Sequence, residues 1–125
     1  MARITTIPLF KDNRLSAGDS GTSDVIDLRY CASRYAFSLR YGIAVGTSAT
    51  AGTTTFSYVA CSTEKGIYIS PSTGGMFGTS GTGKVEAGLI PISPGLTPFM
   101  KIIAAQTGAG TAGAQSVVTA ELNVQ

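Results

Sequence analysis

Apolar side chains alternate with polar or small ones along residues 36–61. The first half of this stretch carries large apolar residues at every second position: Phe37, Leu39, Tyr41, Ile43 and Val45. A period of two is typical of a β-strand that buries one face. After the small residues of 46–52, residues 53–61 repeat the pattern with Phe56 and Tyr58. The stretch therefore predicts a long β-hairpin at the centre of the core.

The register of this predicted hairpin follows from matching its apolar faces, which places Leu39 opposite Tyr58. Cys61 then lies opposite Ala36. Cys31 precedes Ala36 by five residues, so it is about 17 Å away if that segment stays extended. A disulfide needs Cα atoms within about 7 Å of each other. Both cysteines are therefore predicted to be free thiols. Two cysteines without any histidine in the chain predict no metal site.

Further short strands are indicated by alternating or β-branched and aromatic runs between turn sequences. These strands cover residues 24–30, 67–70, 84–92, 99–105 and 116–125. Residues 16–24 read as a turn, and residues 71–83 read as a long loop rich in Gly, Ser and Thr. No stretch has the pattern of an amphipathic helix of three turns. The predicted class is all-β, an antiparallel β-sandwich or jelly roll of about seven to eight short strands.

The first 13 residues lack a clean period and contain Pro8, which confines any strand there to a sheet edge. They predict an extended N-terminal arm (1–13) ahead of a single β-sandwich domain (14–125). Such an arm can dock on its own domain or on a neighbour, and its removal is expected to leave the fold intact. Candidate subunit contacts are apolar residues on otherwise polar or arm-like segments: Phe10, Met76 and Phe77. Each could instead cap the core of its own domain.

The composition points to partners that are proteins. Charged residues make up 13% of the chain, about half the typical share, and there is no Trp or His. So little charge on a small domain indicates that other subunits cover part of the surface, which favours a homo-oligomer. A net charge of +2 with scattered basic residues does not predict nucleic-acid binding. No apolar run is long enough to span a membrane, and no signal peptide is recognisable, so a soluble chain made in the cytoplasm is expected.

The sequence motifs that could carry chemistry do not predict an enzyme. Residues 78–84, GTSGTGK, have the spacing of a phosphate-binding loop, but Val85 replaces the expected Ser or Thr, and a strand pattern follows where a helix should begin. Serine catalysis lacks a histidine base. Tyrosines and arginines interleave between residues 29 and 41, yet the low net charge favours a core and edge role over nucleic-acid stacking. No cofactor or small-molecule substrate is predicted.

Several short motifs together resemble a group of small all-β virion structural proteins of tailed bacteriophages and prophages. They are SDVIDLR at 23–29, FSL at 37–39, SPGLTPFMKI at 93–102 and the closing VVTAELNVQ. The resemblance spans most of the chain, although the loop at 71–83 and the GTSAT turn are not part of it. It implies a structural role in the virion without active-site residues.

Three functions follow from these observations, in order of preference. The first is a capsid decoration (cement) protein that works as a small homo-oligomer and binds the major capsid protein or another virion protein. The second is a self-assembling filament or surface-layer subunit, which low charge and an extendable arm would also suit. The third is a receptor- or glycan-binding module on a tail, which the absence of Trp disfavours.

Overall fold

The computed structural model describes residues 4–16, 19–29, 37–45, 53–71, 76–78, 86–92, 97–107 and 115–125. These residues form nine strands and contain no helix, and therefore no helix that could cross a bilayer. The strands are β1 (Thr5–Ser16), β2 (Ser20–Thr22), β3 (Ile26–Asp27), β4 (Phe37–Val45), β5 (Thr53–Cys61), β6 (Met76–Gly78), β7 (Glu86–Ile92), β8 (Phe99–Thr107) and β9 (Gln115–Val124). The predicted all-β class is confirmed.

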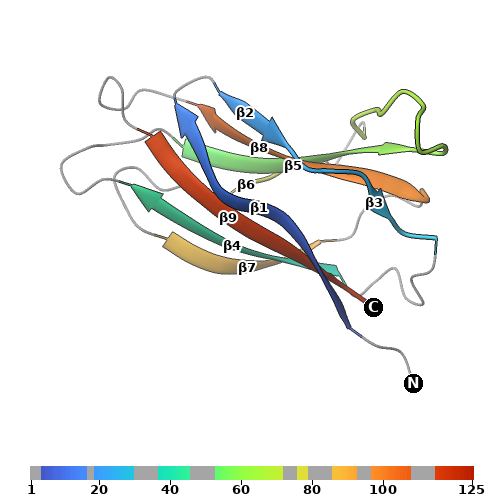
Figure 1. Cartoon of the computed structure of the whole chain (residues 1–125), viewed down its shortest axis with the longest axis horizontal. Coiled ribbons are helices and arrows are strands. Elements are labelled where there is room, and N and C mark those ends of the chain that lie inside the picture. Colours follow the sequence, from blue (N-terminus) through green and yellow to red (C-terminus); the bar gives the residue numbers. More distant parts are fainter. Residues whose placement is uncertain are drawn as a thin grey trace.

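The strands form two antiparallel sheets packed face to face (Figure 1). Sheet A has the order β1-β9-β4-β7, and sheet B has the order β2-β8-β5-β6. β3 also pairs with β8, at Phe99 and Met100, whereas β2 pairs with residues 103–105. Chain neighbours such as β1 and β2, β4 and β5, and β8 and β9 lie in opposite sheets. This winding is that of a jelly roll, in which the connections alternate between the two sheets. The sandwich predicted from strand spacing is therefore present in its jelly-roll form.

The core lies between the two sheets and is built from the inward positions of both. Alternate residues of β9 are at most 3% exposed, as the period-two pattern predicted: Val118, Ala120, Leu122 and Val124. Sheet B contributes Phe56 and Ile102, both fully buried, and sheet A contributes Leu39. Tyr41 and Phe56 meet across the interface with ring centroids 5.5 Å apart. The contact joins the two sheets, because Tyr41 belongs to β4 and Phe56 to β5.

The predicted hairpin of residues 36–61 is wrong. β4 pairs with β7 and β9, whereas β5 pairs with β6 and β8, so the two strands belong to different sheets. The alternation identified the buried faces correctly, since Leu39 and Tyr58 both point into the core. Two apolar faces can match side by side in one sheet or face to face across a sandwich, and a period of two does not distinguish these arrangements. The connection at 46–52 lies outside the described residues.

The segment predicted as an arm is, from Thr5 onward, an integral edge strand. β1 runs antiparallel to β9, with Thr5 opposite Val124 and Ser16 opposite Gln115, and no break occurs at the expected boundary after residue 13. Its lost periodicity has a cause: the register shifts between Pro8 and Phe10 and again between Phe10 and Asn13. Such bulges interrupt the alternation of faces. The edge position expected from Pro8 is confirmed.

Two further differences concern short strands. The turn predicted at 16–24 contains β2, and Ser23 continues along β8 through a 2.8 Å bond from its N–H to the carbonyl of Ile102. The Ile102 N–H in turn donates to Ser23 Oγ at 2.9 Å. The strand predicted at 67–70 is only a single bridge, in which Ile69 exchanges two backbone bonds with Ala60 at 3.0 and 2.9 Å.

Two glycines in the paired strands β4 and β7 predict opposite responses to substitution. A Cβ on Gly88 would lie 2.6 Å from the Tyr41 hydroxyl, and the ring is held against Phe56. Gly88→Ala is therefore expected to lower the free energy of unfolding by about 1–3 kcal/mol. Gly42 has open space around its Cβ position, so Gly42→Ala should be neutral or raise stability by up to about 1 kcal/mol. Urea denaturation of both variants checks this, and equal effects would contradict the packing of Tyr41 over Gly88.

Candidate functional site

The three residues predicted as subunit contacts are not brought together. Phe10 is 4% exposed and belongs to the core cluster, so the structure places it in the second role considered for it, capping its own domain. Met76 and Phe77 lie on β6, opposite Ser57 and Phe56 of β5. The side chains of Met76 and Phe77 are outside the described part of the molecule. The loop expected around them is thus partly a strand.

Other motifs singled out from the sequence fall mostly outside the described residues. Of GTSGTGK, only Gly78 is described, at the end of β6. Cys31 and half of the interleaved tyrosines and arginines (Tyr30, Arg34 and Tyr35) are likewise not described. Arg29 is described: its guanidinium lies 5.1 Å from the centre of the Phe99 ring, and it forms an ion pair with Asp27 at 2.7 Å. That ion pair, chiefly its side-chain hydrogen bond, lowers the pKa of the Asp27 carboxyl.

An open apolar site lies at the end of sheet B where β5 finishes. The chain leaves Cys61, turns through residues 62–66, and returns beside β5 because Ile69 bonds to Ala60 on both backbone groups. The Tyr68 hydroxyl donates to the Glu64 carbonyl at 2.8 Å, which fixes the turn against the returning segment. Lys101 of β8 places its Nζ 4.3 Å from the Tyr68 ring centre. The segment 67–71 is therefore anchored on both sides.

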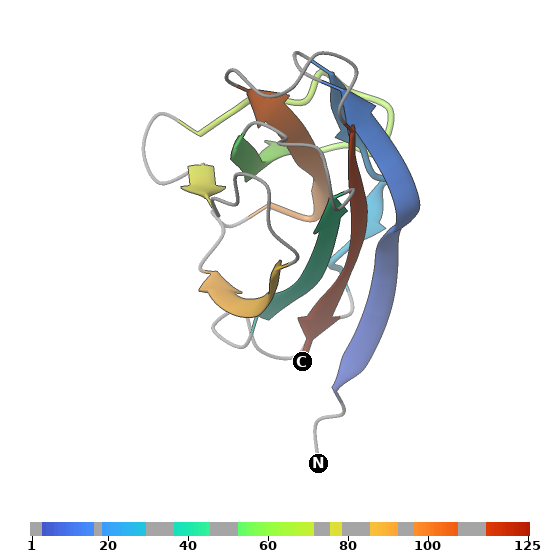
Figure 2. The same ribbon diagram turned by 90° about the vertical axis from the view of Figure 1, so that its left-hand side faces the viewer.

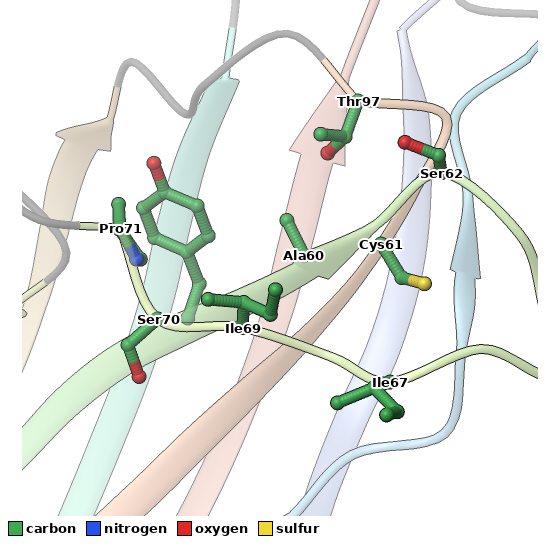
Figure 3. Close-up of a pocket in the computed structure, with 9 residues that line it drawn as sticks. Ala60, Cys61, Ser62, Ile67, Ile69, Ser70, Pro71 and Thr97 are labelled. Atoms are coloured by element: carbon green, nitrogen blue, oxygen red, sulfur yellow. The ribbon is translucent and has the colours of Figure 1, made fainter.

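This arrangement encloses a pocket of about 420 Å³, which we call the β5-end pocket (Figure 3). Its lining is Tyr58, Ala60, Cys61, Ser62, Ile67, Ile69, Ser70, Pro71 and Thr97. Ile67 is 84% exposed and Ile69 is 66% exposed, although both are large apolar residues. Figure 3 shows them on the segment that runs alongside β5, with Ile69 extending toward Ala60. The pocket is thus apolar and open to solvent at its isoleucine side.

Cys61 gives this pocket its one ionisable thiol, and that thiol is free. Its sulfur lies over the turn of residues 62–66, where a Cβ on Gly66 would come within 2.6 Å of it. The backbone N–H of Thr63 lowers the pKa of the Cys61 thiol, with smaller contributions from the Thr63 side chain and the backbone of Ser62 and Gly66. The prediction of a free thiol is confirmed for Cys61, although the hairpin register on which it rested is not.

The β5-end pocket has no acidic or basic side chain in its lining, since none of its nine lining residues is an acid, a histidine, a lysine or an arginine. Within the part of the chain that the structure describes, no group of three or more potential metal ligands occurs. Exposed isoleucines around a concave apolar surface are typical of a site that binds an apolar group of a partner. The pocket lining is therefore suited to an apolar group.

Sequence reasoning did not select the β5-end pocket. The run IYIS at 67–70 predicts a short strand, and no binding surface was assigned to it. The flanking residues carry a signal that Ile67 and Ile69 are not buried. The polar run STEKG before them and Pro71 after them leave a strand too short to bury an apolar face. No known protein family, curated protein or solved structure matches the chain.

Proposed function

We propose that the chain is a structural virion protein of a tailed bacteriophage, and specifically a capsid decoration protein. The proposal is supported by the resemblance of the motifs at 23–29, 37–39 and 93–102 to small virion proteins. The jelly-roll winding also favours it, because this fold recurs among viral capsid domains. Fold alone does not define function, so the main support for the proposal comes from the surface of the molecule.

The observation that carries the proposal is the exposure of Ile67 and Ile69 beside the β5-end pocket. A monomer gains nothing from keeping two isoleucines in water, since each would contribute about 1.5–3 kcal/mol if fully buried. The segment that bears them is held to β5 and to the turn at 62–66, so it presents them in a fixed position. A preorganised apolar surface of this kind binds a partner at little entropic cost.

The proposed mechanism is passive. The decoration protein sits on the assembled shell as a small homo-oligomer, and its β5-end pocket accepts an apolar group of the major capsid protein. Each bound copy bridges neighbouring capsid subunits, and the area it buries offsets forces that would separate them. The function requires no catalysis, cofactor or metal. Its place of action is the virion, after synthesis in the host cytoplasm.

The test uses capsids of the phage that encodes the chain, purified from a strain in which its gene is deleted. Purified protein is added, and the capsids are sedimented and then heated. The proposal expects the protein to sediment with the shells and to raise the temperature at which they break open. Protein that stays in the supernatant would contradict it. Fibres formed by the protein alone in electron micrographs would favour a filament subunit instead.

A further inference from the structure

Three of the four outer strands of the two sheets carry features that block further strand pairing. β2 and β6, at the edges of sheet B, have three residues each. β1 contains Pro8, two register shifts and the left-handed residue Asp12, whose φ is 51°. It also exposes Lys11 and Arg14 along its length. Short length, proline, bulges and charge are the devices by which proteins keep sheet edges from pairing with other chains.

The fourth outer strand, β7, lacks these devices over most of its length. It is seven residues long and pairs with β4 in one unbroken register from Glu86 to Ile92. No strand among the described residues pairs with its other side. Its residues 87–90, AGLI, carry no charge, and Leu89 is 63% exposed. Figure 2 shows β7 on the opposite side of sheet A from β1.

We propose that β7 is the dimer interface, and that it pairs antiparallel with β7 of a second copy of this chain. An antiparallel edge is complementary to itself about a two-fold axis, so the same strand supplies both halves of the ladder. An axis near Gly88 pairs residues 86–90 of the two copies and keeps Pro91, which has no N–H, at the margin of the ladder. The four-stranded sheet A becomes an eight-stranded sheet across the dimer.

The charges near this edge are compatible with the pairing. Arg40 lies beside Leu89 in the register of β4 and β7, and it is the charged residue of β4 closest to the interface. Its guanidinium bonds to Glu121 at 3.0 Å, on the side away from β7. Leu89 is on the outer face of sheet A, where it would lie against Ala87 of the second copy. The interface therefore combines a backbone ladder with burial of an exposed leucine.

A second copy fits this edge better than another partner, because β7 is unbroken and self-complementary and carries no charge over residues 87–90, with Glu86 at the end of the proposed ladder. The β5-end pocket is lined by no residue of β7, so the proposed ladder uses none of its lining. The dimer would be the small oligomer of the proposed function. Only the biological use of the dimer rests on that function. Dimerisation is measured on the isolated protein, and capsid binding is measured separately, so either can fail alone.

Sedimentation velocity of the purified full chain tests the interface between about 1 and 100 μM. The wild-type protein is expected to be a dimer at the upper end of that range. Leu89→Lys, which adds a charge to the edge, should weaken the dimer at least about tenfold. Ile4→Lys is the matched control, since Ile4 is a 73% exposed apolar residue outside the proposed interface. It should dimerise like the wild type.

A monomer at every concentration, or a Leu89→Lys variant that dimerises unchanged, would overturn the proposal. Hydrogen exchange of the wild type keeps the test valid if the variant fails to fold. Amides within residues 86–90 should exchange more slowly at high protein concentration than at low, while those of β1 should not change. Equal exchange in β7 at both concentrations would exclude pairing at this edge.

Discussion

Replacing Phe10 with alanine is expected to lower the free energy of unfolding by about 3–5 kcal/mol, the usual cost of removing a large aromatic side chain from a core. Phe10 is 4% exposed, packs in the core cluster and lies opposite Ala120 of β9. A loss of this size is a large part of the stability of an ordinary domain. Urea denaturation followed by circular dichroism measures it.

Ile4→Ala is the control for this prediction, because Ile4 is equally apolar, lies in the same N-terminal segment and is 73% exposed. Its effect should stay within about 0.5 kcal/mol. The same reasoning reverses the expectation for removal of residues 1–13, which now should unfold the domain by taking away most of β1. A Phe10→Ala protein as stable as the wild type would contradict this prediction and support the interpretation of residues 1–13 as a detachable arm.

The double substitution Ile67→Ser with Ile69→Ser is expected to weaken binding to undecorated capsids by about 100-fold or more. Both side chains are largely in water in the free protein, so their removal should leave the melting temperature nearly unchanged. Burial of these side chains would contribute to the free energy of binding only when the partner covers them. Co-sedimentation with shells across a range of protein concentrations gives the two affinities.

Ile4→Ser serves here as the matched variant, since it removes an exposed isoleucine that does not line the β5-end pocket. It should bind capsids like the wild type. A double variant with wild-type affinity would remove the pocket from the capsid interface while leaving a decoration role possible through another face. Failure of the wild type to bind would contradict the decoration role itself.

The sequence predicted which side chains face inward far better than it predicted which strands are neighbours. Val118, Ala120 and Leu122 stand at alternate positions of the strand predicted at 116–125, and all three are buried. Leu39 and Tyr58 were also assigned to the core correctly, but in one sheet instead of two. Alternation depends on local geometry, whereas pairing depends on connections that cross the sandwich and leave no local pattern.

The segments that were missed share a different cause. β1 is irregular because of its bulges, so its faces do not alternate in sequence. Ser20–Thr22 has turn-like composition and is a strand only because β8 offers it a free edge. Alternation alone could not reveal the exposed isoleucines of the β5-end pocket, since IYIS alternates in the same way whether its apolar face is covered or open, and only the flanking residues STEKG and Pro71 indicate how short the segment is.

The central claim, that the β5-end pocket is the surface that meets the capsid, is tested most directly by the reactivity of Cys61. A Cys31→Ser protein retains Cys61 as its one thiol, and Cys61 lines the pocket. Its rate of alkylation by iodoacetamide is measured in the free protein and in protein bound to capsids at the same pH. The account predicts that binding slows the reaction by about tenfold or more, because the partner covers the thiol. An unchanged rate in the bound protein would contradict it.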